Sequence, residues 1–387
     1  MSFIFFVHVL ALLFSFFVAG VLVGVLYSTT FREHVIDFVY RRRLALVRSL
    51  VNPILRPGLH PWSAEAVFNP AAAVIDGRTH LVYRAIGMDG ASRLGYASSA
   101  NGIVFDERLP YPIYIAQNPR LAMGRPRLYS PVIYPSGGSW GGCEDPRMVT
   151  IAGRVYVTYN AFDGWDFMRV AFISIDENDF LAKRFWKWSP AKLLSRSGER
   201  HKSWVLFPEK INGKFALLHN LHTDSPDRVS IEYVENLDEF NPEHSSIRSA
   251  DPNAVPAVPV AWHYRMRGAG PPPIRTSRGW LLFYHAMSSE EDNRYKLGAM
   301  LLDLGDPARI LHRAVAPVLT PDAPYENRGK PGVVYACGAV VQDGTLFVYY
   351  GGADKVICVA TAPLEKFLKA LVEGDRTRLT PQPALTT

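Results

Sequence analysis

A short strand pattern recurs five times along this chain. In each copy an apolar segment leads into a turn that contains glycine, and four or five β-forming residues follow. The copies are AAAVIDGRTHLVYRA, MVTIAGRVYVTYNA, PEKINGKFALLHN, PIRTSRGWLLFYHA and AVVQDGTLFVYYGG. Their turn glycines are Gly77, Gly153, Gly213, Gly279 and Gly344. Each copy is therefore typical of a β-hairpin.

The spacing of the hairpins predicts the architecture. Neighbouring turn glycines lie about 60 to 76 residues apart, which leaves room for four strands per copy. Helical patterns are scarce after Leu55, and the clearest one covers Leu364–Glu373. We therefore predict an all-β, five-bladed β-propeller. Because the innermost strands of a propeller converge on one channel, polar residues at the strand ends would form a small-molecule site there.

The N-terminus has a different character. Residues 3–27 are almost wholly apolar, which is long enough for a membrane-spanning helix. Arginines follow on the C-terminal side only, which favours a retained anchor with that side in the cytoplasm over a cleaved signal peptide. We predict a transmembrane anchor over 1–30, a basic juxtamembrane helix over 31–58 and a catalytic propeller over 59–387.

The excess of basic residues is concentrated in one part of the sequence, between residues 32 and 56. The net charge is +6 and the pI is about 9.1. Six arginines account for the excess, and we expect them to meet anionic membrane lipids rather than nucleic acid. They are Arg32, Arg41, Arg42, Arg43, Arg48 and Arg56. The three cysteines show no metal-binding spacing, so we expect no metal and no cofactor.

Seven sequence blocks carry a family resemblance. They are Val67–Phe68–Asn69–Pro70, Tyr83–Arg84–Ala85, Ser92–Arg93–Leu94–Gly95–Tyr96–Ala97, Cys143–Glu144–Asp145–Pro146–Arg147, Leu206–Phe207–Pro208–Glu209–Lys210, Gly268–Ala269–Gly270–Pro271–Pro272–Pro273–Ile274 and Tyr349–Tyr350–Gly351–Gly352–Ala353–Asp354. Through these blocks the chain resembles glycoside hydrolase family 130, the β-mannoside phosphorylases, from about Trp62 to Thr361.

The resemblance implies a reaction. Asp145 corresponds to the family's general acid, and inorganic phosphate would attack the anomeric carbon with inversion to give α-mannose 1-phosphate. The substrate would be an oligosaccharide or glycoside, with phosphate as co-substrate. Inverting hydrolases need a base to activate water, but phosphate is already an anionic nucleophile. A phosphorylase needs a cationic clamp instead.

Two sets of candidate residues follow. For phosphate we select cationic and hydrogen-bonding groups near the blocks, namely Arg147, Arg169, Lys202, His219, Tyr284 and His285. For the sugar we select Asn69, Arg84, Ser92, Glu144 and Asp354.

The third repeat departs from the family pattern. Trp204 is bulky where a small residue is expected, and Asn220 replaces a cation. A β-mannoside hydrolase therefore stays open, with Glu209 or Glu232 as a possible base. A membrane-associated mannosyltransferase and a non-catalytic sugar-binding propeller also stay open. The sequence does not indicate an oligomeric state.

Overall fold

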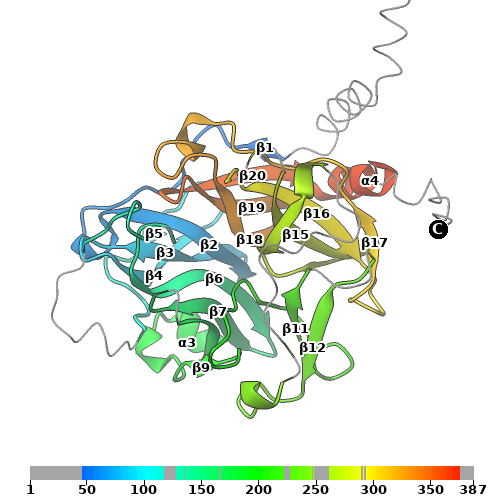
Figure 1. The fold of residues 1–387 in the computed structure, drawn as a ribbon, viewed down its shortest axis with the longest axis horizontal. Coiled ribbons are helices and arrows are strands. Elements are labelled where there is room, and N and C mark those ends of the chain that lie inside the picture. Colours follow the sequence, from blue (N-terminus) through cyan, green and yellow to red (C-terminus); the bar gives the residue numbers. More distant parts are fainter. Residues whose placement is uncertain are drawn as a thin grey trace, which may run out of the picture. The chain divides into compact units, whose positions relative to one another are not determined.

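The computed structural model describes residues 46–374, except 117–127, 135, 165–166, 222–226, 246, 248–260, 289–290 and 292. In that part of the chain, five successive β-meanders lie side by side in a ring (Figure 1). The predicted all-β fold with five propeller-like blades is confirmed.

The blades follow the order of the chain. Blade one contains β2 (Ala66–Ile75), β3 (Arg78–Ile86), β4 (Ala91–Ser99) and β5 (Glu107–Arg108). Blade two contains β6 (Gly141–Ile151), β7 (Arg154–Phe162), β8 (Met168–Asp176) and β9 (Lys192–Leu193). Blade three contains β10 (Val205–Leu206), β11 (Phe215–Asn220) and β12 (Ser230–Val234). Blade four contains β13 (Arg265–Ala269), β14 (Ile274–Thr276), β15 (Gly279–Met287), β16 (Lys296–Leu302) and β17 (Ile310–Arg313). Blade five contains β18 (Val334–Gln342), β19 (Thr345–Gly352), β20 (Val356–Pro363) and β1 (Val47–Arg48).

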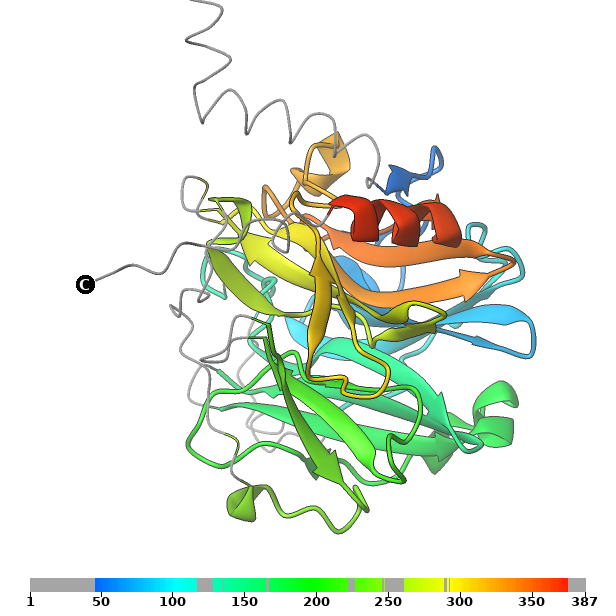
Figure 2. The same cartoon turned by 90° about the vertical axis from the view of Figure 1, so that its right-hand side faces the viewer.

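Helices are short in the described residues. The α-helices are α3 (Glu177–Leu181) and α4 (Leu364–Gly374). The 3-10 turns are η1 (Pro61–Ser63), η3 (Phe185–Lys187), η4 (Pro242–His244), η5 (Ala261–His263) and η6 (Pro324–Glu326). Helix α4 coincides with the helix predicted near the C-terminus and packs against β17 and β20 (Figure 2).

The repeat glycines occupy the hairpin turns as predicted. In Asp76–Gly77, Ala152–Gly153, Asn212–Gly213 and Asp343–Gly344 both residues have positive φ, between 47° and 80°. Two successive positive φ angles define a type I′ turn, whose twist matches that of paired strands. The fourth repeat differs, because only Gly279 has a positive φ there, at 143°.

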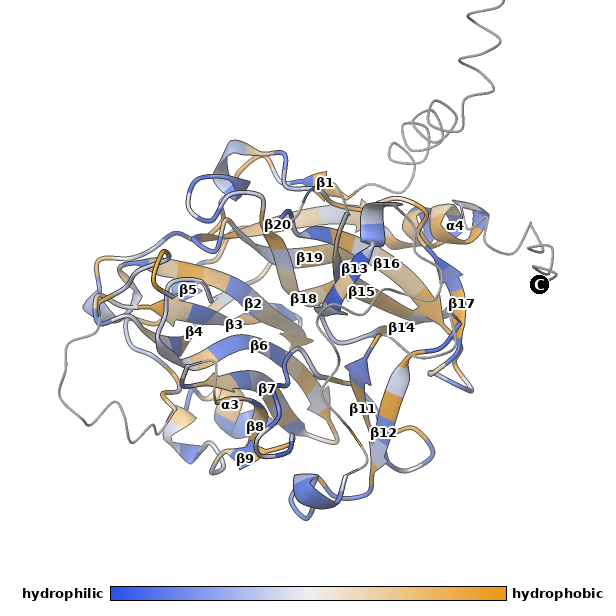
Figure 3. Cartoon of the chain, in the orientation of Figure 1, coloured by the Kyte–Doolittle hydropathy of each residue, from blue (hydrophilic) through white to orange (hydrophobic). Residues whose placement is uncertain are grey.

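The hydrophobic core lies between the blades. One apolar cluster joins blades one and two through residues such as Tyr96 and Met148, and another joins blades five and one. Two more clusters join blade two to three and blade three to four. The strands are accordingly apolar along their length, as β15, β16 and β20 illustrate (Figure 3). Burial on both faces explains why they lack the simple alternation of a solvent-exposed sheet.

The N-terminal segment closes the ring. Val47 pairs with Thr361 and Arg48 with Ala360, so β1 is the outer strand of blade five. The predicted basic helix over 31–58 therefore does not extend over residues 46–58, which contain the strand β1 and no helix. The physical reason is that β20 offers an unpaired edge, and edge strands gain hydrogen bonds by pairing.

The predicted membrane anchor over 1–30 and the arginines at 32 and 41–43 lie outside the described residues. Among the residues that the structure does describe, no helix combines the length and the apolar character needed to cross a bilayer.

Blades one and two share one continuous sheet. The connection is a short parallel pairing of Ala91 with Gly141 and of Ser92 with Gly142. Gly142 has a φ of 112°, and a Cβ atom there would lie 2.1 Å from the carbonyl oxygen of Ser92. Only glycine permits this close approach of the two backbones.

We expect Gly142→Ala to lower the free energy of unfolding by about 3 kcal/mol, since strain at positive φ and a backbone clash add up. Gly153→Ala is the matched control. Its φ is 73°, but no atom lies within 4 Å of the added Cβ, so we expect a loss of only about 1 kcal/mol. Urea unfolding of both variants measures the difference, and equal losses would contradict the close-approach argument.

Candidate active site

Two equivalent bulges shape the inner ends of blades one and two. The pairing register shifts between Phe68 and Ala71 in β2, and between Glu144 and Arg147 in β6. Each bulge holds an Asn-Pro or Asp-Pro pair, and its first residue has positive φ, 48° at Asn69 and 50° at Asp145. Positive φ before proline is unfavourable. Such local strain is characteristic of functional positions.

The bulges bring the two side chains together. Asn69 Nδ2 donates a 2.7 Å hydrogen bond to Asp145 Oδ1. Arg84 Nη1 donates to the same oxygen over 3.1 Å, and Asn160 Nδ2 donates to Oδ2 over 3.4 Å. Asp145 is only 8% exposed. Burial alone would raise its pKa, but Arg84 foremost, then Arg147, Asn69 and Lys202, lower it below the usual value.

The Arg84 guanidinium connects two buried carboxylates. Besides Asp145, it donates through Nη2 to Glu144 Oε1 over 2.7 Å and to Ser139 Oγ over 2.8 Å. Its Nε donates to Ser92 Oγ over 2.9 Å. Arg84 is 2% exposed, so these bonds form in a low-dielectric interior where charge-assisted hydrogen bonds are strong.

Glu144 and Asp145 respond in opposite directions to this environment. Burial raises the pKa of Glu144 to about 7, against the lowering effect of Arg84. Hydroxyls of Ser136 and Ser139 donate to its two oxygens over 2.7 and 3.0 Å. The neighbouring carboxylates share one guanidinium, and like-charge repulsion disfavours ionising both. Asp145 holds the charge more readily, and it alone of the two lines the pocket.

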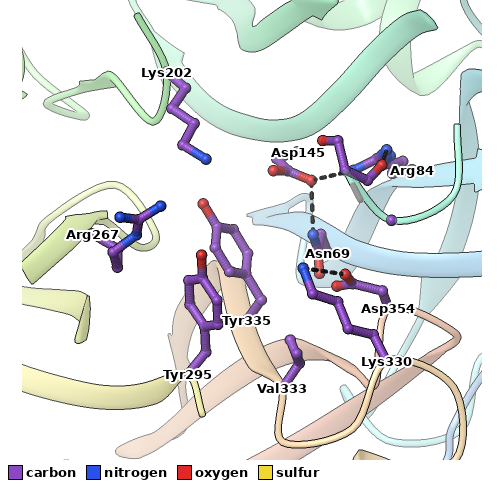
Figure 4. A pocket seen from close by; sticks show the side chains of 12 residues that line it. Asn69, Arg84, Asp145, Lys202, Arg267, Tyr295, Lys330, Val333, Tyr335 and Asp354 are labelled. Atoms are coloured by element: carbon purple, nitrogen blue, oxygen red, sulfur yellow. Dashed lines mark hydrogen bonds and ion pairs between the residues drawn. The ribbon is translucent and has the colours of Figure 1, made fainter. Parts of the chain in front are cut away.

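Asp145 opens onto a cavity of about 200 Å³. The side chains that line it come from several blades and are predominantly polar. They are Asn69, Arg84, Ser136, Asp145, Lys202, Arg267, Tyr295, Lys330, Val333, Tyr335 and Asp354, with Gly137. Figure 4 shows Arg267 on the far side of the cavity from Asn69 and Asp145, with Tyr335 and Tyr295 between them.

The electrostatic potential of this cavity is positive. Four cationic side chains among the described lining residues face two carboxylates, those of Asp145 and Asp354. The pKa of Tyr295 is affected by these cations. Burial alone would raise its pKa, but Lys202, Arg267 and Lys330 lower it below the ordinary value of tyrosine. A cavity that favours the phenolate anion will also favour other anions.

Comparison with known proteins identifies the family. The family model of glycoside hydrolase family 130, described as β-1,4-mannooligosaccharide phosphorylase, matches residues 54–373. This chain belongs to glycoside hydrolase family 130. It is accordingly an enzyme of glycosyl transfer.

Three relatives illustrate the similarity. A 1,2-β-oligomannan phosphorylase of Thermoanaerobacter sp. is 36% identical over 82% of this chain and 97% of the relative. A β-1,2-mannobiose phosphorylase of the same organism is 33% identical over 83% and 98%. A solved structure is 25% identical, and its description states that the family contains glycoside hydrolases that target β-1,2-mannosidic linkages in Candida mannan. It covers 83% of this chain and 94% of its own, with a TM-score of 0.62.

The predicted sugar ligands of this family 130 chain cluster around Asp145. Asn69, Arg84 and Asp354 line the cavity. Ser92 and Glu144 lie behind Arg84 and hold its guanidinium. Their functional role stays a prediction, and Ser92 and Glu144 contact the cavity lining without being part of it, through Arg84 and, for Glu144, also through Ser136.

Of the six predicted phosphate ligands, only Lys202 lines the cavity. Arg147 is 2% exposed and donates to the backbone carbonyls of Gly270, Asp145 and Ala269 at 2.8–3.1 Å. Arg147 thereby holds the bulge of blade two against blade four. It does not line the cavity, and its part in phosphate binding stays a prediction.

Arg169 and His219 also lie off the cavity. The Arg169 guanidinium donates to the carbonyl of Ser195, with Glu243 at 3.5 Å. The His219 ring packs 5.6 Å from that of Trp204, and burial lowers its pKa to about 4. At neutral pH His219 is therefore uncharged. Neither Arg169 nor His219 lines the cavity, and their part in phosphate binding stays a prediction.

Tyr284 and His285 are buried in blade four. The Tyr284 hydroxyl lies 3.1 Å from His263 Nδ1, and Tyr284 does not line the cavity. His285 stacks on Tyr335 at 3.8 Å, and its Nε2 accepts from the Ala336 amide over 2.9 Å. Burial lowers the pKa of His285 to about 3, so it is neutral. It supports Tyr335 and is not itself a lining residue.

Sequence reasoning missed five lining residues that carry polar groups: Ser136, Arg267, Tyr295, Lys330 and Tyr335. Arg267 immediately precedes the Gly268–Ile274 block, and that position was an available signal. Tyr295 and Lys330 lie between the repeats, where no periodic pattern indicated which side chains reach the centre.

Arg84→Met tests the buried charge network. It would leave Glu144 and Asp145 without their shared cation, and we expect the free energy of unfolding to fall by about 3–5 kcal/mol. Adding Glu144→Gln should recover part of this loss. Arg78→Met, which removes an exposed pair with Asp106 at 2.7 Å, should cost less than about 1 kcal/mol. Urea unfolding measures all three, and equal losses for Arg84→Met and Arg78→Met would be inconsistent with the network.

Proposed function

We propose that this chain is an inverting phosphorylase of β-mannosides in which Asp145 is the general acid and Lys202 and Arg267 bind phosphate. The observation that carries the proposal is the arrangement of the cavity. A buried carboxylate lies on one side, and the cationic side chains of Lys202 and Arg267 line the same space from blades three and four. A glycosyl acceptor that is an anion fits this arrangement better than water does.

The proposed reaction needs only Asp145, the mannoside and phosphate to account for every bond that breaks or forms. Asp145 gives its proton, directly or through a sugar hydroxyl, to the glycosidic oxygen as the bond from that oxygen to the anomeric carbon breaks. A phosphate oxygen forms a bond to the same carbon from the opposite face. The products are α-mannose 1-phosphate and a saccharide shortened by one mannosyl unit. Cations at the phosphate side stabilise its charge as it enters the transition state.

The lowered pKa of Asp145 is compatible with this role. A general acid must carry its proton when the sugar is bound. Phosphate brings negative charge to the cations that lower the pKa of Asp145, Lys202 among them. A bound anion counteracts these cations and raises the pKa of a nearby carboxyl. Phosphate binding and protonation of the acid are thereby coupled.

The linkage that we propose is β-1,2. The two relatives with 36% and 33% identity, each covered almost completely, are named for β-1,2-linked mannose. The relative named for β-1,4-mannooligosaccharides is 30% identical over 57% of this chain.

A hydrolase of β-1,2-mannosides is the second candidate, because the description of a structure 25% identical to this chain states that the family contains such hydrolases. Hydrolysis with inversion needs a carboxylate base on the opposite face of the sugar. Besides Asp145, the described lining offers Asp354, which lies 3.6 Å from Lys330. Glu209 is paired with Arg275, and Glu232 lies on β12; neither lines the cavity. This distribution favours phosphorolysis.

Phosphate dependence tests the proposal. The detergent-solubilised full chain with β-1,2-mannobiose should form α-mannose 1-phosphate only when phosphate is present, as measured by phosphorus NMR. Asp145→Asn should lower kcat by about 10²- to 10⁴-fold, because the general acid is lost, while its circular dichroism spectrum stays that of the wild type. Release of free mannose at an equal rate without phosphate would establish the hydrolase instead.

Lys202→Met tests the clamp and its coupling to the acid. The KM for phosphate should rise on the order of 10- to 100-fold, since a charged hydrogen bond is lost. Removing Lys202 also removes one cause that lowers the pKa of Asp145. That pKa should rise, so the acid stays protonated to higher pH and the alkaline limb of kcat/KM for mannobiose moves upward. Lys210→Met is the control, because Lys210 lies over the Phe215 ring and does not line the cavity. An unchanged phosphate KM in Lys202→Met would refute the assignment.

A further inference from the structure

A buried carboxylate lies at the base of one wall of the active site. Glu326, at the end of η6, is 0% exposed. Its Oε1 accepts hydrogen bonds from Arg48 Nε over 2.7 Å and from the Tyr350 hydroxyl over 2.8 Å. Its Oε2 accepts from Arg48 Nη2 over 2.9 Å and from the Ala323 amide over 2.8 Å. All of the donors come from outside the cavity, so the carboxylate has no direct part in the chemistry.

The cation of this cluster comes from the N-terminal segment. Arg48 belongs to β1, and its Nη2 also donates to the Thr320 carbonyl. The guanidinium thus engages both oxygens of one carboxylate, which fixes its orientation. This corrects the prediction that Arg48 meets membrane lipids. Residues 46–53 precede the region that matches the family, which begins at residue 54. Arg48 therefore lies outside the matched region.

A loop leads from Glu326 directly into the active site. The Val333 amide donates to the Glu326 carbonyl over 3.3 Å, which closes the loop at its base. The Gly332 amide donates to Asn327 Oδ1 over 3.0 Å. At the far end of the loop the Lys330 amide donates to the Ala353 carbonyl over 2.9 Å. Lys330 and Val333 both line the cavity, so the position of the base sets the position of two lining residues.

The same carboxylate is linked to a second lining element. Tyr350 lies on β19, and the chain continues from it through Gly351, Gly352 and Ala353 to Asp354. Asp354 Oδ2 lies 3.6 Å from Lys330 Nζ. Glu326 thus contacts both segments that supply this pair, and Figure 4 shows the pair on the side of the cavity away from Arg267.

The N-terminal segment has another attachment nearby. Asn52 Nδ2 donates to the Val359 carbonyl over 2.8 Å, and the Val359 amide donates to Asn52 Oδ1 over 2.9 Å. These two bonds secure the segment to β20 without Arg48. Loss of the Arg48 side chain should therefore leave β1 in place, and its effect should fall on Glu326 and the loop.

We propose that Arg48 is a positioning residue, which holds Glu326 and thereby the loop of residues 326–333 that presents Lys330 to the mannoside. The kinetic part of this inference rests on the proposed phosphorylase function, whereas the structural part does not. Arg48 acts on the side of the cavity with Lys330 and Asp354, and not on the side with Lys202 and Arg267. Its removal should therefore affect the two substrates unequally.

Arg48→Met in the full chain tests the inference. Misplacement of a substrate-binding loop should raise the KM for β-1,2-mannobiose on the order of tenfold, with the KM for phosphate changed less than about twofold. Hydrogen–deuterium exchange should become faster in peptides that cover residues 326–335 and stay unchanged in β6 and β7. Arg48→Lys keeps the charge but loses the bidentate geometry, so it should give an intermediate KM for mannobiose.

Arg228→Met is the matched control. It also removes a bidentate arginine–carboxylate pair, with Asp306 at 2.9 and 3.2 Å, but at an exposed site. Both KM values and the exchange of residues 326–335 should match the wild type. A merely structural role of Arg48 would reduce the folded fraction and kcat while leaving both KM values unchanged, which would overturn the inference. Unchanged exchange at residues 326–335 in Arg48→Met would also overturn it, even if the wild type proved to be a hydrolase.

Discussion

The active site depends on one guanidinium that neutralises two adjacent buried carboxylates. Without Arg84, Glu144 and Asp145 would bring two negative charges into an interior that solvates them poorly. With it, the charge settles on Asp145, where Asn69 and Asn160 also donate, and Glu144 retains its proton more readily. The polar groups of Ser92, Ser136 and Ser139 complete the network. The proposed role of Asp145 as the general acid thus depends on the whole cluster.

Strand bulges direct the side chains of this cluster toward the cavity. In regular strands Asn69 and Asp145 would follow the alternation of their neighbours. The bulges with positive φ turn both side chains inward at corresponding places in adjacent blades. Asn160 extends the arrangement to blade three, because its Oδ1 accepts from the Ser203 amide over 3.0 Å, next to Lys202. Asn160 therefore connects Asp145 to the segment that carries Lys202 on the opposite wall.

The sequence predicts the parts of this structure that are encoded locally. Hairpins follow from Asp-Gly and Asn-Gly turns, and Asn69, Arg84 and Asp145 lie in blocks whose motif places them in the cavity. Arg147 follows Asp145 closely in the sequence, but its guanidinium donates to carbonyls from blade four instead of lining the cavity. Tyr284 and His285 lie within β15, where they contact His263 and Tyr335. Lys330 and Tyr295 reach the cavity through contacts between distant segments, which no local pattern encodes.

Closure of the ring by β1 has a consequence for biosynthesis. The ribosome makes Val47 early, whereas its partner Thr361 emerges only near the end of translation. Blades one to four can assemble as each is completed, since domains form from the N-terminal side first. The outer edge of blade five must wait for a contact of very high sequence separation, and such contacts form slowly. Until then the nascent chain carries an open ring, with Arg48 and Glu326 both unpaired.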